Sequence, residues 1–240
     1  MQLDPTLLRK GLSAERLGGY VARGKVSGDD EVLSHYLWNI ALCESLYPVL
    51  QCLEVTLRNS IHDALTQSSN DRWFEDARLL HGHKEQEAIR DAKARLRILG
   101  KPDESGRIVA ELRFGFWTSL FDRRYEQVLW PRHLKSVLPE MPRKIRTRKT
   151  VSWQLEEARR LRNRVFHHEP IWYWSDLLDK HARLLETLRW INPAVVNVID
   201  LIDRFPTTFR IGVAPLRTMV TALLPVPSSP PGPTEAGAAT

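Results

Sequence analysis

The side chains best suited to chemistry lie in the stretch Arg160–Pro170, which reads RLRNRVFHHEP. It combines arginines, an amide, two imidazoles and a carboxylate at the end of a predicted helix, which Pro170 is expected to stop because its ring clashes with the preceding turn. Residues four apart share a helix face, so Asn163 aligns with His167. Imidazole transfers protons near neutral pH, and guanidinium binds phosphate through a planar set of donors. These groups suit metal-independent RNA transesterification, or a structural role in which the histidines interact favourably with the helix C-terminus and Arg162 pairs with Glu54.

This chemistry predicts a role for each polar group of the stretch. His167 is the candidate base or acid, and Arg162 is the candidate phosphate-binding group. Asn163 would orient His167 or donate a hydrogen bond to phosphate. His168 or Glu169 would supply the second proton-transfer partner. Because the 2′-hydroxyl is the nucleophile, DNA should not be cut.

The segment Arg162–His167 resembles the R-N-x-x-x-H form of the R-x(4-6)-H motif of the HEPN superfamily, and its surroundings resemble the Abi-like (abortive infection) branch. Residues 36–59 and 114–117 are similar to the long early helix and the middle of that branch. The likeness spans about residues 14–200. It implies a metal-independent endoribonuclease of phage-defence or toxin type without a cofactor, whose catalytic residues are Arg162, Asn163 and His167.

The same resemblance implies a homodimer in which two motif helices face each other across one composite site. A toxic RNase needs control, so an antitoxin or regulatory protein is a further candidate partner.

Polar residues of the long early helix are candidate supporting groups. Glu54, Arg58 and His62 recur every four residues and therefore share one face, with Asn59 adjacent. They either orient the motif or form an ordinary exposed ion pair. Arg162 lies at the apolar edge of its own helix, so partial burial is expected, and Glu54 or a phosphate would be its partner.

Positive charge gathers beside the motif. The chain carries a net charge of +6, and residues 143–164 alone hold nine Lys or Arg against two Glu. A basic patch of this kind favours RNA over a membrane as the partner. The candidate RNA-binding residues are Arg143, Lys144, Arg146, Arg148, Lys149 and Arg164. Two alternatives remain: a solvated basic helix, or a catalytically silent HEPN-like module that binds RNA or a protein.

Other patterns argue against a metal, a disulfide or a membrane span. Adjacent helical residues such as His167 and His168 point about 100° apart, so they do not easily share a zinc ion. Cys43 and Cys52 lie nine residues apart on one predicted helix and are expected to be reduced. No signal peptide opens the chain and no apolar run approaches about 18 residues, so a cytoplasmic protein is expected.

Apolar residues recur at spacings of three and four, without convincing strand alternation, which predicts an all-α fold. With the resemblance, this indicates an HEPN-like helical bundle with additional helices, in which the early helix packs against the motif helix. The predicted helices cover residues 4–22 (as a hairpin or broken helix), 31–65 (kinked or divided at Pro48), 84–99, 108–121, 176–190 and 193–203, with the motif helix starting near Thr150 and Ser152 as its candidate N-cap.

The predicted organisation has four parts. Residues 1–28 form an N-terminal helical extension, 29–204 the HEPN-like Abi helical domain, and 205–223 a C-terminal extension. Residues 224–240 are rich in Pro, Ser, Gly and Ala, and this composition predicts a disordered tail.

Overall fold

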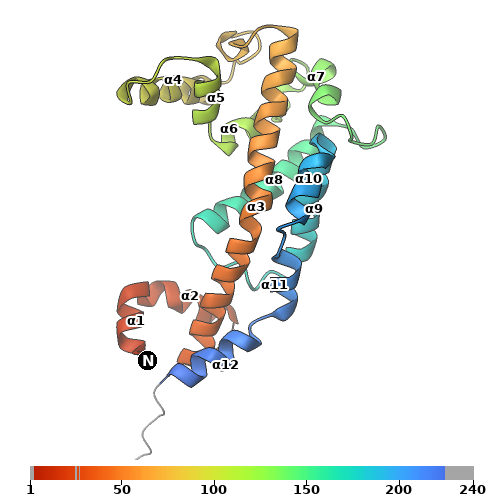
Figure 1. Ribbon diagram of the computed structural model, residues 1–240. Coiled ribbons are helices and arrows are strands. Elements are labelled where there is room, and N and C mark those ends of the chain that lie inside the picture. Colours follow the sequence, from red (N-terminus) through yellow and green to blue (C-terminus); the bar gives the residue numbers. More distant parts are fainter. Residues whose placement is uncertain (1–2, 25, 27, 225–240) are drawn as a thin grey trace, which may run out of the picture. The chain divides into compact units, whose positions relative to one another are not determined.

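The computed structural model describes residues 3–24, 26 and 28–224, which form helices joined by turns and loops, with no β-strand among them (Figure 1). The predicted all-α class is confirmed. The helices are α1 (Pro5–Leu12), α2 (Ala14–Gly24), α3 (Asp29–Ser68), α4 (His83–Ile98), α5 (Ser105–Glu111), α6 (Phe114–Ser119), α7 (Trp130–Val137), α8 (Arg148–Phe166), α9 (Leu177–Ile191), α10 (Pro193–Asp200), α11 (Phe205–Ile211) and α12 (Ala214–Leu223), with 3₁₀ turns at Trp73–Glu75 and Arg123–Tyr125. The predicted disordered tail lies outside the described residues apart from Leu224.

The chain divides into two compact units, and the division falls within α3. One unit contains the described residues within 1–39 and 211–224, and the other contains residues 40–210. The sequence interpretation placed the corresponding boundaries at residues 28/29 and 204/205. In the first unit, Tyr20 packs edge-on against Tyr36 with ring centres 5.6 Å apart, and Arg217 of α12 pairs with Glu31 of α3.

Helix α3 runs unbroken for 40 residues with Pro48 in its interior. The predicted division at Pro48 is therefore wrong. An interior proline costs a helix about 3 kcal/mol because it removes one backbone hydrogen bond. Leu46, Val49 and Leu53 beside it are each at most 1% exposed. Burial of such side chains contributes about 1.5–3 kcal/mol each, which offsets the cost.

Length and composition would also allow α3 to cross a membrane. Its most apolar 18-residue stretch has a mean hydropathy of 1.3. On this measure α3 differs from the expectation that no run approaches the length of a span. The measure alone is weak evidence, because the core helix of a water-soluble protein meets the same test.

The predicted single helix over residues 108–121 is two short helices, α5 and α6. Leu112 and Arg113 between them are extended, with ψ angles of 128° and 160°. This break allows Phe114, Phe116 and Trp117 all to be buried, which a narrow stripe on one continuous helix would not achieve. The indole of Trp117 donates to the Leu112 carbonyl at 3.3 Å and closes the turn.

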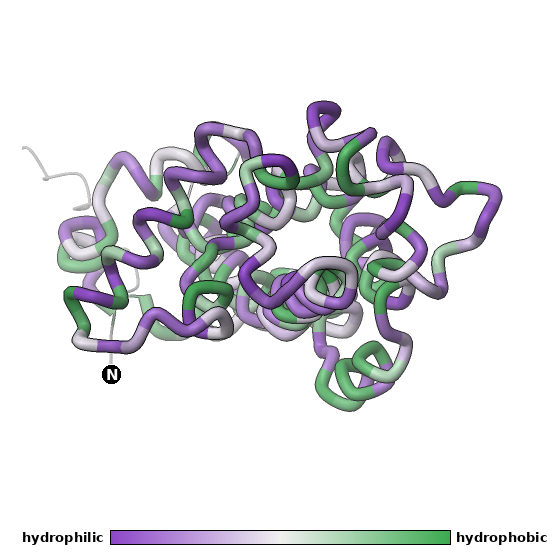
Figure 2. The backbone as a smooth tube through the Cα atoms, turned by 90° about the horizontal axis from the view of Figure 1, so that it is seen from above, coloured by the Kyte–Doolittle hydropathy of each residue, from purple (hydrophilic) through white to green (hydrophobic). Residues whose placement is uncertain are grey.

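Helix α8 packs against α6 and α9. It begins at Arg148, because the Thr147 hydroxyl accepts a hydrogen bond from the Thr150 amide at 3.1 Å and caps the first turn. The prediction of Ser152 as N-cap is wrong, and Ser152 lies inside the helix. Seen from above, hydrophobic and hydrophilic segments alternate along the helices (Figure 2), as expected for amphipathic helices that bury one face.

Candidate functional site

The candidate site lies at the C-terminal end of α8. His168 has a left-handed backbone conformation and forms the turn that ends this helix. The Glu169 amide donates to the Arg164 carbonyl at 2.9 Å, and the His168 amide donates to the Val165 carbonyl at 3.2 Å. His168 has φ = 57°, so the turn is a Schellman motif with histidine where glycine is preferred. Helix α8 therefore ends at Phe166, four residues before Pro170, and the left-handed turn at His168 ends it rather than Pro170 as predicted.

Arg162 is held between a carboxylate and an aromatic ring. Its Nη2 lies 3.5 Å from Glu54 Oε2 on α3, and its guanidinium carbon lies 4.5 Å from the Phe166 ring centre. Phe166 is backed by Tyr47 of α3, with ring centres 6.0 Å apart. The Arg162 side chain is 28% exposed, and its buried Nε has no hydrogen-bond acceptor among the described residues. The predicted partial burial and the pairing with Glu54 are both present.

Asn163 and His167 lie one turn apart, since the His167 amide donates to the Asn163 carbonyl at 2.9 Å. Asn163 is half-buried and His167 is exposed. In the described part of the chain, neither side chain is held by a hydrogen bond. The imidazole is therefore open to a ligand.

Arg164 and Glu169 face a different set of partners from Arg162. Arg164 Nη1 lies 3.2 Å from Glu169 Oε2 and 3.3 Å from the Tyr173 hydroxyl, and the guanidinium lies 5.3 Å from the Trp174 ring centre. Arg164 thus links α8 to the segment that follows it, residues 169–174. It is not available as the predicted RNA contact unless these bonds break.

The four polar residues of α3 that were predicted to support the motif lie in three different surroundings: Glu54, Arg58, Asn59 and His62. Glu54 alone of the four contacts Arg162 in the part of the chain described. Arg58 Nε donates to Asn59 Oδ1 at 3.3 Å, and Asn59 lines a separate groove of about 560 Å³ that also includes Val195 of α10. His62 Nδ1 accepts a hydrogen bond from Trp73 Nε1 at 3.1 Å, and burial lowers the pKa of His62.

The basic segment formed by residues 143–149, which leads into the first turn of α8, uses two of its arginines in internal hydrogen bonds. Arg146 Nε donates to the Met141 carbonyl and Arg148 Nη1 to the Phe121 carbonyl, both at 2.9 Å. Arg143, Lys144 and Lys149 are exposed. These three remain the accessible cations of the predicted RNA-binding set.

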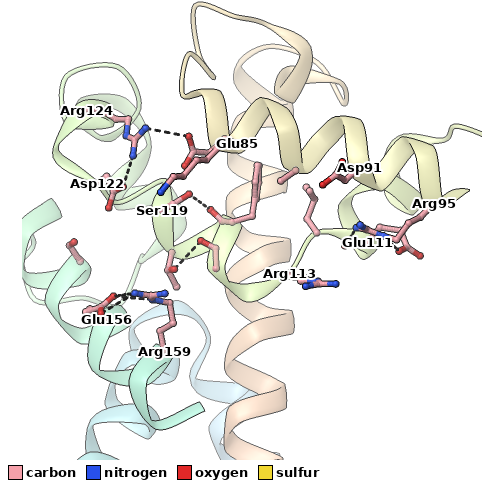
Figure 3. Close-up of a pocket in the computed structure, with 17 residues that line it drawn as sticks. Glu85, Asp91, Arg95, Glu111, Arg113, Ser119, Asp122, Arg124, Glu156 and Arg159 are labelled. Atoms are coloured by element: carbon pink, nitrogen blue, oxygen red, sulfur yellow. Dashed lines mark hydrogen bonds and ion pairs between the residues drawn. The ribbon is translucent and has the colours of Figure 1, made fainter. Parts of the chain in front are cut away.

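Another groove, of about 570 Å³, contains none of the predicted site residues. It lies between α4 and α8 over α6 (Figure 3), and is named the α4–α8 groove here. Three of its arginines are paired across short distances: Arg95 with Glu111 at 3.2 Å, Arg124 with Asp122 at 3.1 Å, and Arg159 with Glu156 at 2.9 Å. These pairs neutralise much of the charge on its walls.

A buried polar network lies at one wall of this groove. The Tyr125 hydroxyl donates to Glu85 Oε2 and accepts from the Gly82 amide, each at 3.0 Å. Arg124 Nη1 lies 3.6 Å from the same carboxylate oxygen, a contact drawn in Figure 3. Burial raises the pKa of Tyr125 to about 12. A Cβ on Gly82 would clash with both Glu85 and Tyr125. We name this set the Glu85–Tyr125 network; sequence analysis missed it because its members are far apart in the chain.

Metal-ligand groups do not converge in the part of the chain that the structure describes, where no three His, Cys, Asp or Glu side chains are arranged to hold an ion. Cys43 and Cys52 form no disulfide, as predicted, and burial raises the pKa of Cys43 to about 11.

Fold and site together define an all-α protein with an exposed, polar helix end beside a half-buried arginine. Comparison with known proteins finds no family model, no curated protein and no solved structure that matches this chain.

Proposed function

We propose that the protein is a metal-independent endoribonuclease with an HEPN-like helical bundle, in which His167 and Arg162 act on one phosphodiester. The arrangement of Arg162 carries the proposal. Its guanidinium is oriented by Glu54 and Phe166, while His167, five residues later, presents an exposed imidazole. The 3.5 Å separation from Glu54 is long for a charge-assisted hydrogen bond, so a phosphate can compete for the same guanidinium.

The proposed reaction is an internal transesterification. His167 accepts the proton of the ribose 2′-hydroxyl, the oxygen attacks the adjacent phosphorus, and the bond to the 5′-oxygen breaks. Arg162 donates hydrogen bonds to the phosphate oxygens as negative charge develops on them. A second group protonates the leaving 5′-oxygen. The products are a 2′,3′-cyclic phosphate and a 5′-hydroxyl.

The second proton donor is the part of the site that one chain leaves open. Glu169 is paired with Arg164, and the His168 backbone is constrained by the left-handed turn. A homodimer would supply a second His167 opposite the first. This homodimer, the phage-defence or toxin role and control by an antitoxin or regulatory protein all rest on the HEPN and Abi resemblance. The proposed cytoplasmic setting rests instead on the sequence patterns described above.

Cleavage of labelled RNA in EDTA tests the proposal. We expect wild type to leave 2′,3′-cyclic phosphate ends. His167→Ala should reduce the rate by about 10²–10⁴-fold, the range for loss of general acid–base catalysis. Arg162→Ala should reduce it by about 10²–10³-fold, the range for loss of one donor to the developing charge. His83→Ala is the matched control, because His83 is also exposed but lies on α4. Equal cleavage by wild type and His167→Ala would refute the assignment of His167.

A second candidate is a catalytically silent HEPN-like module that binds RNA. Exposure of Arg143, Lys144 and Lys149 favours it, because no carboxylate pairs with them in the described residues. In that case wild type would bind RNA without cutting it. Replacing the three cations by alanine would then weaken affinity and flatten its salt dependence, whereas Arg162→Ala and His167→Ala would change affinity little.

A further inference from the structure

Trp153 of α8 is unusual among the tryptophans of this chain. Of the eight, all of which lie in the described residues, it is the only one that is exposed, at 53%. Trp73, Trp117, Trp130 and Trp190 are buried in the core. An indole in water forgoes the stabilisation that burial of a large aromatic side chain provides. The guanidinium of Arg183 on α9 lies over this ring, 5.7 Å from its centre, which adds a cation over one face of the exposed indole.

Trp153 lies on the same stripe of α8 as two cations and His167. Lys149, Trp153, Arg160 and His167 follow one another at spacings of four, seven and seven residues. At about 100° per residue, these positions stay within about 40° of one another around the helix. The rise of about 1.5 Å per residue separates Trp153 from His167 by about 21 Å along the axis. An aromatic ring, two cations and the candidate catalytic imidazole therefore form one line.

The two cations on this stripe can be released to a ligand. Arg160 is 67% exposed, and its contacts with Glu156 and Glu157 are both 3.4 Å. Each of these carboxylates has a closer partner: Glu156 lies 2.9 Å from Arg159, and Glu157 lies 2.8 Å from Lys180. Exposed pairs of this kind contribute little stability, so exchange of the Arg160 contacts for a phosphate costs little.

We infer that this stripe binds a single-stranded RNA segment, with a base stacked on Trp153, phosphates on Lys149 and Arg160, and the scissile phosphate at His167. The inference rests on the proposed function and extends it to the class of RNA. Stacking on a protein side chain requires an unpaired base, because bases in a duplex already stack on their neighbours. Cations alternating with an aromatic platform are the usual elements of single-strand binding.

The test measures RNA binding in the His167→Ala background, so that the RNA stays intact. The probes are a fluorescent single-stranded RNA of mixed sequence and its duplex, followed by anisotropy. One stacked base contributes about 1–3 kcal/mol, so Trp153→Ala should weaken single-strand affinity about 5–150-fold. Trp153→Phe should keep most of it. The matched control is Ile98→Ala, which removes an exposed apolar side chain from α4.

Two further measurements complete the test: the salt dependence of variants that lack Lys149 or Arg160, and the affinity for duplex RNA. Lys149→Ala and Arg160→Ala should each lower the slope of log affinity against log salt by about 0.7, the value for one phosphate of a single strand. Equal affinity of Trp153→Ala and its parent, or duplex binding as tight as that of the single strand, would overturn the inference while leaving cleavage by wild type as evidence for the proposed function. Trp153-dependent binding without any cleavage would support the inference and remove the proposed function.

Discussion

The end of α8 and the Glu85–Tyr125 network contain similar polar side chains in opposite surroundings. At the end of α8, Arg162 has one long contact with Glu54, and His167 is exposed. In the network, Glu85 is 2% exposed and accepts a hydrogen bond from Tyr125, which itself accepts from Gly82. Polar groups that satisfy one another in the interior stabilise the fold, and those left partly unsatisfied near the surface are free to bind a ligand.

His62 and His167 show the same contrast between a half-buried, hydrogen-bonded side chain and an exposed one. The His62 imidazole accepts a hydrogen bond from Trp73, and burial lowers its pKa. His167 has no such partner among the described residues and lies at the surface. The predicted grouping of His62 with the motif thus fails for a structural reason, since Trp73 occupies its ring nitrogen.

Among the changes that test this comparison, Tyr125→Phe is expected to alter the free energy of unfolding most. The substitution leaves the Gly82 amide without the Tyr125 hydroxyl as its acceptor and leaves the buried Glu85 carboxylate only its 3.6 Å contact with Arg124, which should lower the free energy of unfolding by about 1–3 kcal/mol. Cleavage under native conditions should not change, because the network lies apart from His167. Urea denaturation and the RNA assay measure the two quantities.

The matched control is Tyr47→Phe, since Tyr47 is 49% exposed. It should change the free energy of unfolding by much less than Tyr125→Phe. If Tyr125→Phe instead reduced cleavage at unchanged stability, the network would belong to a functional site and the comparison would be broken.

A smaller change in the free energy of unfolding is expected when the pH is lowered. The pKa of His62 is lowered in the folded protein, chiefly by burial, while the unfolded chain titrates near 6.5. As pH falls below 6.5 the unfolded state binds protons first, so the free energy of unfolding should decrease. His133 and His181, whose pKa values are also lowered by burial, add to this decrease.

His62→Asn isolates the contribution of His62, because an amide keeps a hydrogen-bond acceptor for Trp73 but does not titrate. Denaturation from pH 7 to 5.5 should show a shallower decrease in this variant than in wild type. An identical decrease in both proteins would mean that His62 does not contribute.

The smallest change in the free energy of unfolding is expected from substitution of His168, the residue with the left-handed backbone conformation. His168→Gly should raise the free energy of unfolding by about 0.5–1 kcal/mol, because glycine adopts φ = 57° without the Cβ penalty and loses part of this gain to chain entropy. The same variant removes an imidazole, so its cleavage rate shows whether His168 is a proton-transfer partner. Destabilisation by glycine would contradict the strain at this turn.

Residues close in sequence were predicted better than contacts between distant ones. The helices α3, α4 and α9 follow from apolar periodicity, since one buried stripe per helix suffices to specify them. The position where α8 ends was missed because the left-handed turn at His168 depends on hydrogen bonds that no single residue type announces. The break between α5 and α6 was missed because burial of several aromatic side chains overrides local helix propensity.

By itself, the sequence determined the helical class and the density of ionisable groups in residues 160–170, since both are properties of local order along the chain. Tertiary structure alone decided which of those groups are available. It used Arg146, Arg148 and Arg164 in internal contacts and left His167 and Trp153 exposed. The reason is physical: hydrogen-bond partners and burial come from residues distant in the chain, and no spacing within one helix specifies them.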